Sequence, residues 1–152
     1  MRPEYEALCA KLDIQDNVQF LGYREDIPEL LAETDISVLT SVKEGIPRAL
    51  LESMAMGIPV VATRVNGNRE VVRDGETGLM VELDDDQAFT EALERLLTDP
   101  GLRREIGDRS RDVAFREYDE SAIAEAILTV YRGLLSQREA ARQVPSTRTV
   151  ES

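Results

Sequence analysis

The chain has 152 residues, the size of one ordinary domain, and we expect a single hydrophobic core. It carries 30 acidic against 18 basic residues, a net charge of −12, with no histidine and one cysteine. This charge makes nucleic acid and anionic membranes poor partners. Without histidine, serine–histidine triads and histidine-ligated metal are excluded, and a single cysteine leaves neither an internal disulfide nor a zinc site to expect.

The amino terminus, MRPEYEALCAKLD, lacks the apolar block of a secretory signal. No apolar run approaches the roughly 20 residues that a membrane helix needs. We therefore expect a cytoplasmic protein without a transmembrane segment. Cys9 lies among apolar residues of a helical pattern and is expected to be a small, unreactive core residue.

Apolar periodicity predicts the elements of the first half in chain order. We expect a helix that ends near Asp13, a short strand VQFLG at 18–22, a helix over about 27–33 and a buried strand DISVLTS at 35–41. Next comes KEGIPRALLESMAMG at 43–57, a loop and then a helix. Pro47 suits the first helical position of that helix, and Gly57 closes it.

The second half begins with a continuous β-branched run, PVVATRV at 59–65, and ends in helices. A loop with room for one helical turn leads to the last short strand, GLMVEL at 78–83. From Asp85 onward the pattern predicts helices only: one in DDQAFTEALERLLTD, a second over about 100–116 and a third over about 119–141. The polar tail VPSTRTVES is expected to fray. The stripe of the last helix is expected to pack: Ile123, Ile127, Val130 and Leu134.

Short apolar strands that alternate with helices predict an α/β domain. We expect a parallel sheet of about four strands that is covered by helices on both faces, with a helical carboxyl end. Open α/β sheets bind ligands outside the carboxyl ends of their strands. The candidate loops are therefore 22–26, 41–47 and 64–70.

The helix start at Pro47 predicts an anion site, because the N–H groups of a first turn have no helical partner and carry the positive end of the dipole. Glu44 lies in the approach loop, and Glu52 lies about one and a half turns along the helix. Carboxylates bind hydroxyls rather than phosphates. A ligand with phosphates and sugar hydroxyls fits both features. From spacing alone, however, the favoured interpretation is ordinary: Glu44 stabilised by the dipole and Glu52 paired with Arg48.

The run from VQFLG to DGETGLMV resembles the donor-binding half of family 4 (group 1) glycosyltransferases, which have the GT-B fold. Its most specific part, EGIPRALLESMAMGIPVVAT, is similar to that family's E-x7-E element and the following strand. The pieces FLG, NG with its later glutamate, and DGETGL agree in order and spacing. The resemblance extends to about residue 135. It implies a partial Rossmann-like, three-layer donor domain over 1–135, with a parallel sheet of about four strands and carboxyl-terminal helices, followed by a helix end and polar tail over 136–152.

The resemblance also implies roles for individual residues. In the family, the first glutamate of the pair contacts the donor hexose and the second holds the ribose hydroxyls, roles that fall here on Glu44 and Glu52. Backbone amides at the helix start would face the diphosphate and sugar, and two residues after FLG would lie beside the base. A further acidic residue follows a glycine pair, which reads NG here. The helix-start positions are Gly45, Ile46, Arg48 and Ala49. The two residues beside the base are Tyr23 and Arg24, and the further acidic residue is Glu70.

The structural alternatives stay open for the residues outside the glutamate pair. The favoured interpretation of Tyr23 is a half-buried aromatic at a strand end, and that of Arg24 is a solvated turn residue. Gly67, Gly75 and Gly78 are consistent with simple turn formers. The arginines of the second carboxyl-terminal helix, interleaved with acids, indicate a solvated face: Arg103, Arg104, Arg109 and Arg111.

The activity implied is retaining transfer of a hexosyl unit from a nucleotide diphosphate sugar to an acceptor hydroxyl, without metal or other cofactor. The acceptor, a sugar or a lipid-linked sugar, would bind through an amino-terminal domain that this chain lacks, so the chain alone is expected to be inactive. Two family strands that would lie between VQFLG and DISVLTS are also absent. We therefore expect VQFLG to pair with a remaining strand, or a second copy of the chain to cover the open edge.

Two other functions remain open. One is a non-catalytic module that binds a nucleotide or a protein partner. The other is a GT-B epimerase or phosphorylase. A phosphorylase of the pyridoxal type would need a lysine, and neither Lys11 nor Lys43 has a suitable context.

Overall fold

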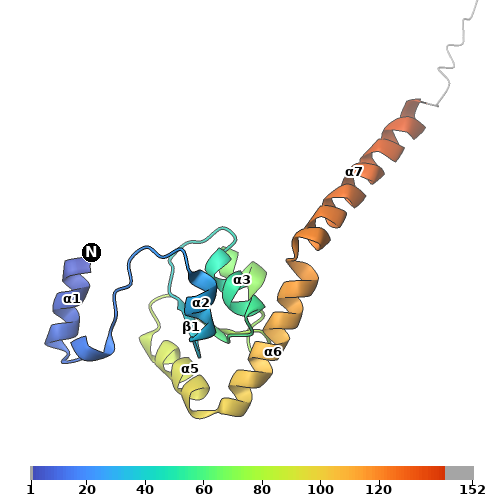
Figure 1. The fold of residues 1–152 in the computed structure, drawn as a ribbon. Coiled ribbons are helices and arrows are strands. Elements are labelled where there is room, and N and C mark those ends of the chain that lie inside the picture. The colour runs from blue at the N-terminus through green and yellow to red at the C-terminus, as the bar shows by residue number, and fades with distance from the viewer. Residues whose placement is uncertain (1, 143–152) are drawn as a thin grey trace, which may run out of the picture.

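The computed structural model describes residues 2–142. Their elements alternate between helices and short strands before the chain ends in helices alone (Figure 1). In chain order they are α1 Arg2–Lys11, the 3-10 turn η1 Gln15–Asn17, α2 Ile27–Ala32, β1 Ser37–Leu39, α3 Arg48–Ala55, β2 Val60–Thr63, α4 Asn66–Val71, β3 Leu79–Val81, α5 Asp86–Thr98, α6 Pro100–Glu117 and α7 Glu120–Arg142. No helix in this described part is long and apolar enough to cross a bilayer.

The three strands form one parallel sheet in the order β1-β2-β3. Ser37 is paired with Val60 and Val61 with Leu79, so β2 is the central strand. Helix α3 connects β1 to β2, and α4 connects β2 to β3. Parallel strands require such crossovers, which is why the sheet carries helices on its faces. The α/β fold class predicted from the sequence is confirmed.

The core has two parts, one on each face of the sheet. Alternate residues of β2 separate them: Val60 and Ala62 pack with Leu50 and Met54 of α3, whereas Val61 packs with Leu96 of α5. Helix α6 contributes to both parts, through Val113 and Ala114 on one face and Ile106 on the other. The arrangement gives three layers, with the fully buried β2 in the middle.

The helix starts and ends follow their local sequence chemistry. Asp85 caps α5 by accepting a hydrogen bond from the Ala88 N–H at 2.9 Å, and Asp99 caps α6 in the same way from Leu102. Gly57 ends the turn after α3 with a φ of 74°, a conformation that glycine adopts without strain. The predicted closure of the 43–57 helix at Gly57 is confirmed.

The predicted strand VQFLG is wrong. Residues 18–22 form no strand and pair with neither sheet edge, so the described sheet has three strands rather than about four. An extended apolar stretch becomes a strand only when another backbone accepts its hydrogen bonds. For the same reason β1 is an edge strand, and Val38 is 48% exposed instead of buried as predicted for DISVLTS.

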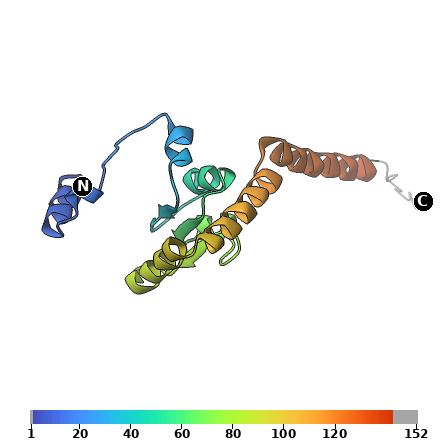
Figure 2. The ribbon, with the colours of Figure 1, turned by 60° about the horizontal axis from the view of Figure 1, so that its bottom comes forward.

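Helices α1 and α7 stand away from the three layers at opposite ends of the molecule (Figures 1 and 2). In α1, Cys9 is buried as predicted, but Tyr5 and Leu8 are about half exposed. The α7 stripe was expected to pack, and that expectation is wrong for the described residues: Ile123, Ile127, Val130 and Leu134 are 45–63% exposed. The predicted fraying concerns the tail, which lies outside the described residues.

Candidate functional site

The candidate site surrounds the start of α3, at the carboxyl edge of the sheet. β1 ends at Leu39, and the loop after it leads directly into α3. Pro47 is the N-cap residue in an extended conformation, so the prediction that it occupies the first helical position is wrong by one residue. Its carbonyl accepts hydrogen bonds from the Leu50 and Leu51 N–H groups, at 3.1 and 3.2 Å. This pattern places the first turn of the helix beside the loop.

No side chain caps α3, so the N–H groups of its first turn have no partner from a capping residue. Arg48 and Ala49, which supply these amides, are exposed. Gly45 and Ile46 are also exposed, and a Cβ built on Gly45 would meet no atom within 4 Å. The approach to the helix start is therefore open, as an anion site requires.

The carboxylate of Glu44 is held within its own loop. Glu44 is half-buried, and its Oε1 accepts a hydrogen bond from the Ser41 hydroxyl at 2.6 Å. A hydroxyl that donates to a charged carboxylate makes one of the stronger hydrogen bonds in a protein. The Glu44 carboxylate is therefore directed toward Ser41 within the loop that leads into α3.

Glu52 is the other carboxylate of the pair and lies one and a half turns along α3. Its Oε1 is 3.4 Å from Nη2 of Arg48, an exposed i,i+4 pair. Glu52 also lines a mainly apolar cavity of about 240 Å³ between α2 and α3, together with Ile27, Leu31 and Met56. Glu44 is not among the residues that line it, so the two carboxylates do not share this cavity.

Sequence reasoning missed three polar residues beneath the Glu44 loop. They are Ser41, Thr63 at the end of β2, and Asn68 of α4, and hydrogen bonds connect them in sequence. Thr63 and Asn68 are buried. The one available signal was the position of Ser41 three residues before Glu44, because a hydroxyl at that distance can reach a carboxylate in a turn. Asn68 lies within the candidate loop 64–70 but was not singled out there, and Thr63 gave no signal, since a buried threonine in a β-branched run is ordinary.

Gly67 in the NG pair also contacts this loop. A Cβ at Gly67 would lie 1.6 Å from the Gly45 carbonyl oxygen and 2.8 Å from the Glu44 carbonyl carbon. The backbone of α4 therefore packs directly on the Gly45 carbonyl group. Gly67 is required by this close approach rather than by a turn.

The three remaining candidate residues are spread over other segments. Tyr23 is 89% exposed, which contradicts a half-buried aromatic at a strand end. Arg24 pairs with Asp26, and this ion pair raises the pKa of the guanidinium and lowers that of the carboxyl. Glu70 is exposed on α4. Its backbone carbonyl accepts a hydrogen bond from the Tyr118 hydroxyl at 2.7 Å. Burial, together with the charge of Glu117, raises the pKa of Tyr118.

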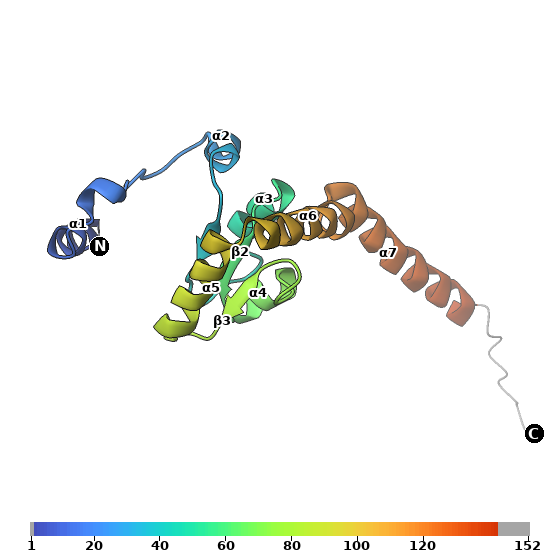
Figure 3. The ribbon, with the colours of Figure 1, turned by 90° about the horizontal axis from the view of Figure 1, so that it is seen from below.

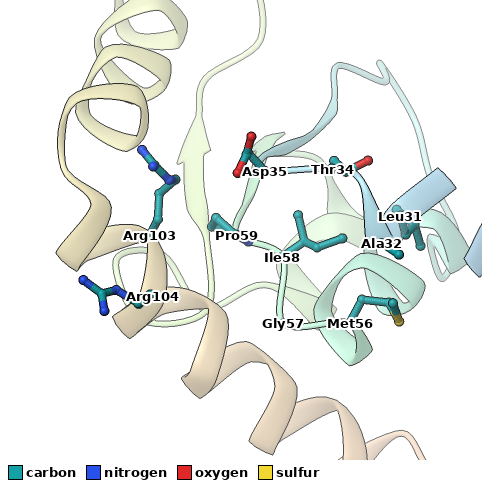
Figure 4. Close-up of a pocket in the computed structure, with 10 residues that line it drawn as sticks. All are labelled: Leu31, Ala32, Thr34, Asp35, Met56, Gly57, Ile58, Pro59, Arg103 and Arg104. Atoms are coloured by element: carbon teal, nitrogen blue, oxygen red, sulfur yellow. The ribbon is translucent and has the colours of Figure 1, made fainter. Parts of the chain in front are cut away.

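A cavity of about 410 Å³ lies at the amino edge of the sheet, the edge opposite this site (Figure 4). Asp35 and Pro59 line it just before β1 and β2 begin, so it opens at the amino edge. Arg103 and Arg104 reach it from α6. Arg103 is not simply solvated as predicted, because its Nη1 donates to the Leu96 and Leu97 carbonyls at the end of α5, at 2.5 and 3.0 Å.

A second cavity, of about 330 Å³, lies at the carboxyl edge near the loop of Glu44. It is lined by Thr40, Val42 and Thr63 on one side and by the acidic turn 82–86 on the other. Figure 3 shows β2, β3 and α5, three elements that contribute residues to this lining, next to one another. Among residues 2–142, no group of three or more acidic or cysteine side chains is arranged to hold a metal ion.

Comparisons with known proteins agree on one family. The model of the family "Glycosyl transferases group 1" matches residues 1–113. A putative glycosyltransferase of Bacillus subtilis (strain 168) is 37% identical over 131 residues, which cover 86% of this chain and 34% of that protein. The N-acetyl-alpha-D-glucosaminyl L-malate synthase of Bacillus anthracis is 37% identical over 128 residues, covering 84% and 34%. The chain thus spans about a third of the length of these relatives.

Solved structures give the same result for the fold. The HepE protein of Anabaena, crystallised in complex with UDP, matches with a TM-score of 0.81 at 27% identity, over 86% of this chain and 36% of that one. The carboxyl-terminal domain of LpcC from Francisella tularensis matches with a TM-score of 0.70 at 28% identity, over 78% and 63%. The architecture is therefore that of GT-B glycosyltransferases, as the sequence predicted.

Proposed function

Because the chain belongs to the group 1 glycosyltransferases, we propose that it binds a nucleotide diphosphate sugar at the start of α3. The observation that supports this most is the uncapped and exposed first turn of α3, with Glu44 in the loop before it and Glu52 one and a half turns after its start. The helix dipole favours the diphosphate. The two carboxylates accept hydrogen bonds from hydroxyls of the hexose and of the ribose, respectively.

The reaction in the proposal is transfer of a hexosyl unit to an acceptor hydroxyl with retention of configuration. Departure of the diphosphate places negative charge next to the first-turn amides of α3, which stabilise it without any movement. Glu44 orients the hexose, and Glu52 fixes the nucleotide end of the donor. No metal or other cofactor takes part.

Within this proposal, residues 1–135 are the donor-binding part of a larger catalytic unit. The acceptor binds to another part of that unit. HepE, a structural neighbour of this chain, has been solved with UDP and with UDP-glucose, which makes these two compounds the natural first probes. A binding module without catalysis is the second candidate, because the donor site and the acceptor site can be separated.

The test is calorimetric titration of the chain with UDP, GDP, ADP and their hexose derivatives. We expect saturable binding of at least one nucleotide, weakened by Glu52→Ala by about 10- to 100-fold, because hydrogen bonds to a charged group are lost. Glu94→Ala is the matched control, since Glu94 is an exposed glutamate on α5 far from α3 in the sequence. A parent chain that binds no nucleotide, or a Glu52→Ala variant with unchanged affinity, contradicts the proposal.

A further inference from the structure

The position of Glu44 depends on a series of hydrogen bonds that begins in the core. The first bond is from the Ser41 hydroxyl to Oε1 of Glu44, at 2.6 Å. A serine hydroxyl alone cannot fix a carboxylate, because it can rotate among three staggered positions. Its direction is useful only if the Ser41 backbone is itself held in place.

Thr63 holds the backbone of Ser41. Thr63 is the last residue of β2 and is 5% exposed. Its hydroxyl lies 2.5 Å from the Ser41 carbonyl oxygen and 3.5 Å from that of Leu39. A hydroxyl has one hydrogen to donate, and the shorter distance identifies Ser41 as the acceptor. The loop that carries Glu44 is thus attached to the central strand of the sheet.

Asn68 holds Thr63 from the other side. Asn68 is fully buried, and its Nδ2 donates to the Thr63 carbonyl at 2.9 Å and lies 3.5 Å from Thr63 Oγ1. The bond to a carbonyl fixes which end of the amide is the nitrogen. Oδ1 of Asn68 is the single buried side-chain polar atom without a hydrogen-bond partner in the described part of the chain. Such an atom costs stability, so Asn68 is poorly explained as a packing residue and well explained as a donor to Thr63.

Helix α4 contacts the loop at a second point. Gly67, next to Asn68, lies against the Gly45 carbonyl group so closely that a Cβ would meet its oxygen at 1.6 Å. The loop is therefore held at Ser41 by hydrogen bonds and at Gly45 by backbone contact. The first contact comes from Thr63 at the end of β2, and the second comes from Gly67 at the start of α4.

We propose that Ser41, Thr63 and Asn68 are positioning residues that aim the Glu44 carboxylate at the hexose of the donor. This inference rests on the proposed function, which gives Glu44 the hexose and Glu52 the ribose. It goes further in one respect: the three residues control recognition of the sugar and leave recognition of the nucleotide unchanged. A purely structural role would weaken both.

The test compares UDP with UDP-glucose as ligands of the chain carrying Ser41→Ala or Thr63→Val. We expect affinity for UDP-glucose to fall about tenfold, since one charge-assisted hydrogen bond loses its geometry. Affinity for UDP should stay within about twofold of the parent. Thr63→Ser keeps the hydroxyl and should restore the parent affinity. Ser136→Ala and Thr90→Val, which remove exposed helical hydroxyls, are the matched controls.

Amide hydrogen exchange provides a measurement that needs no ligand. In Ser41→Ala and Thr63→Val, the amides of Glu44 and Gly45 should exchange about threefold faster or more, while those of α5 stay unchanged. Equal weakening of UDP and UDP-glucose, or unchanged exchange at Glu44, overturns the inference. If the parent binds neither ligand, the proposed function fails, and the exchange rates still decide whether these residues hold the loop.

Discussion

Gly67 shows how one residue can serve the site without touching a ligand. The sequence left it between a turn former and a family feature, and the structure shows a backbone contact with Gly45 instead. Spacing along the chain cannot reveal this contact, because residues 45 and 67 meet only after β2 and α4 have folded. Glu44 and Glu52, by contrast, are selected through the resemblance of their segment to a known family, because their spacing alone favours an ordinary surface role, and their binding roles stay a prediction.

Gly67→Ala is expected to destabilise the fold by roughly 1–3 kcal/mol, because the new methyl group overlaps a backbone oxygen and one of the two segments must move. Chemical denaturation measures the change. Gly133→Ala is the control, since a Cβ there meets nothing within 4 Å, and it should be neutral or slightly stabilising. An unchanged stability for Gly67→Ala would show that the close contact is not present.

Asp74 explains part of the DGETGL turn and gives the fold a pH dependence. Burial alone would raise the pKa of Asp74, but hydrogen bonds from the Met80 N–H, at 2.9 Å, and from Arg64 outweigh it and lower the pKa below its ordinary value. The charged form thus stabilises the folded chain. This contribution is present above about pH 4, the ordinary range of the unfolded carboxyl, and is lost as the pH falls through the lower folded pKa.

Asp74→Asn should therefore cost stability at neutral pH and cost progressively less below about pH 4. The loss at neutral pH should be at most about 1 kcal/mol, because the Asp74 side chain is 44% exposed and solvent screens its ion pair. Urea denaturation across the acid range measures it, with Asp108→Asn on the exposed surface of α6 as the control for net charge. A penalty that grows as the pH falls would contradict this sign.

At the scale of elements, local patterns correctly predicted the helices that satisfy their own backbone hydrogen bonds and the strands that pair within the chain. Helix α3 and its glycine stop, strand β2 and the capped helices α5 and α6 all appear where periodicity placed them. VQFLG and the α7 stripe fail for one shared reason. Neither segment is buried in the described part of the chain, and an apolar pattern alone does not say where a packing partner lies.

The α7 stripe permits a direct test of this explanation. Ile127 is 51% exposed, so Ile127→Ala should change the unfolding free energy by no more than about 0.5 kcal/mol. Leu96→Ala removes a fully buried side chain of α5 and should cost about 2–5 kcal/mol. Thermal or chemical denaturation of both variants gives the comparison. A cost for Ile127→Ala equal to that of Leu96→Ala would show that α7 packs on the core or on a second copy.

At the scale of the whole molecule, family membership explains the three-layer architecture. It also agrees with the open sheet edge at β1, because the chain spans about a third of the length of its relatives. The three layers reproduce the architecture of the solved relatives, with TM-scores of 0.70–0.81 for HepE and the LpcC domain. The chain matches 36% of the HepE chain and 63% of the crystallised carboxyl-terminal domain of LpcC. The expected cover of the open sheet edge by a second copy stays a prediction.

The net charge of −12 also bears on the site. An acidic surface repels a diphosphate at long range, so attraction must come from short-range groups, and the first-turn amides of α3 are such groups. Ionic strength should therefore affect binding weakly, or should improve it by screening the repulsion.

The most direct measurement is an amide NMR titration of the isotope-labelled chain with UDP. We predict that the largest saturable shifts fall on the amides of residues 44–52, with Arg48 and Ala49 among the most affected. Shifts at the amino-edge cavity around Asp35, Pro59 and Arg103 instead (Figure 4), or saturation without any change at 44–52, would contradict a donor site at the start of α3.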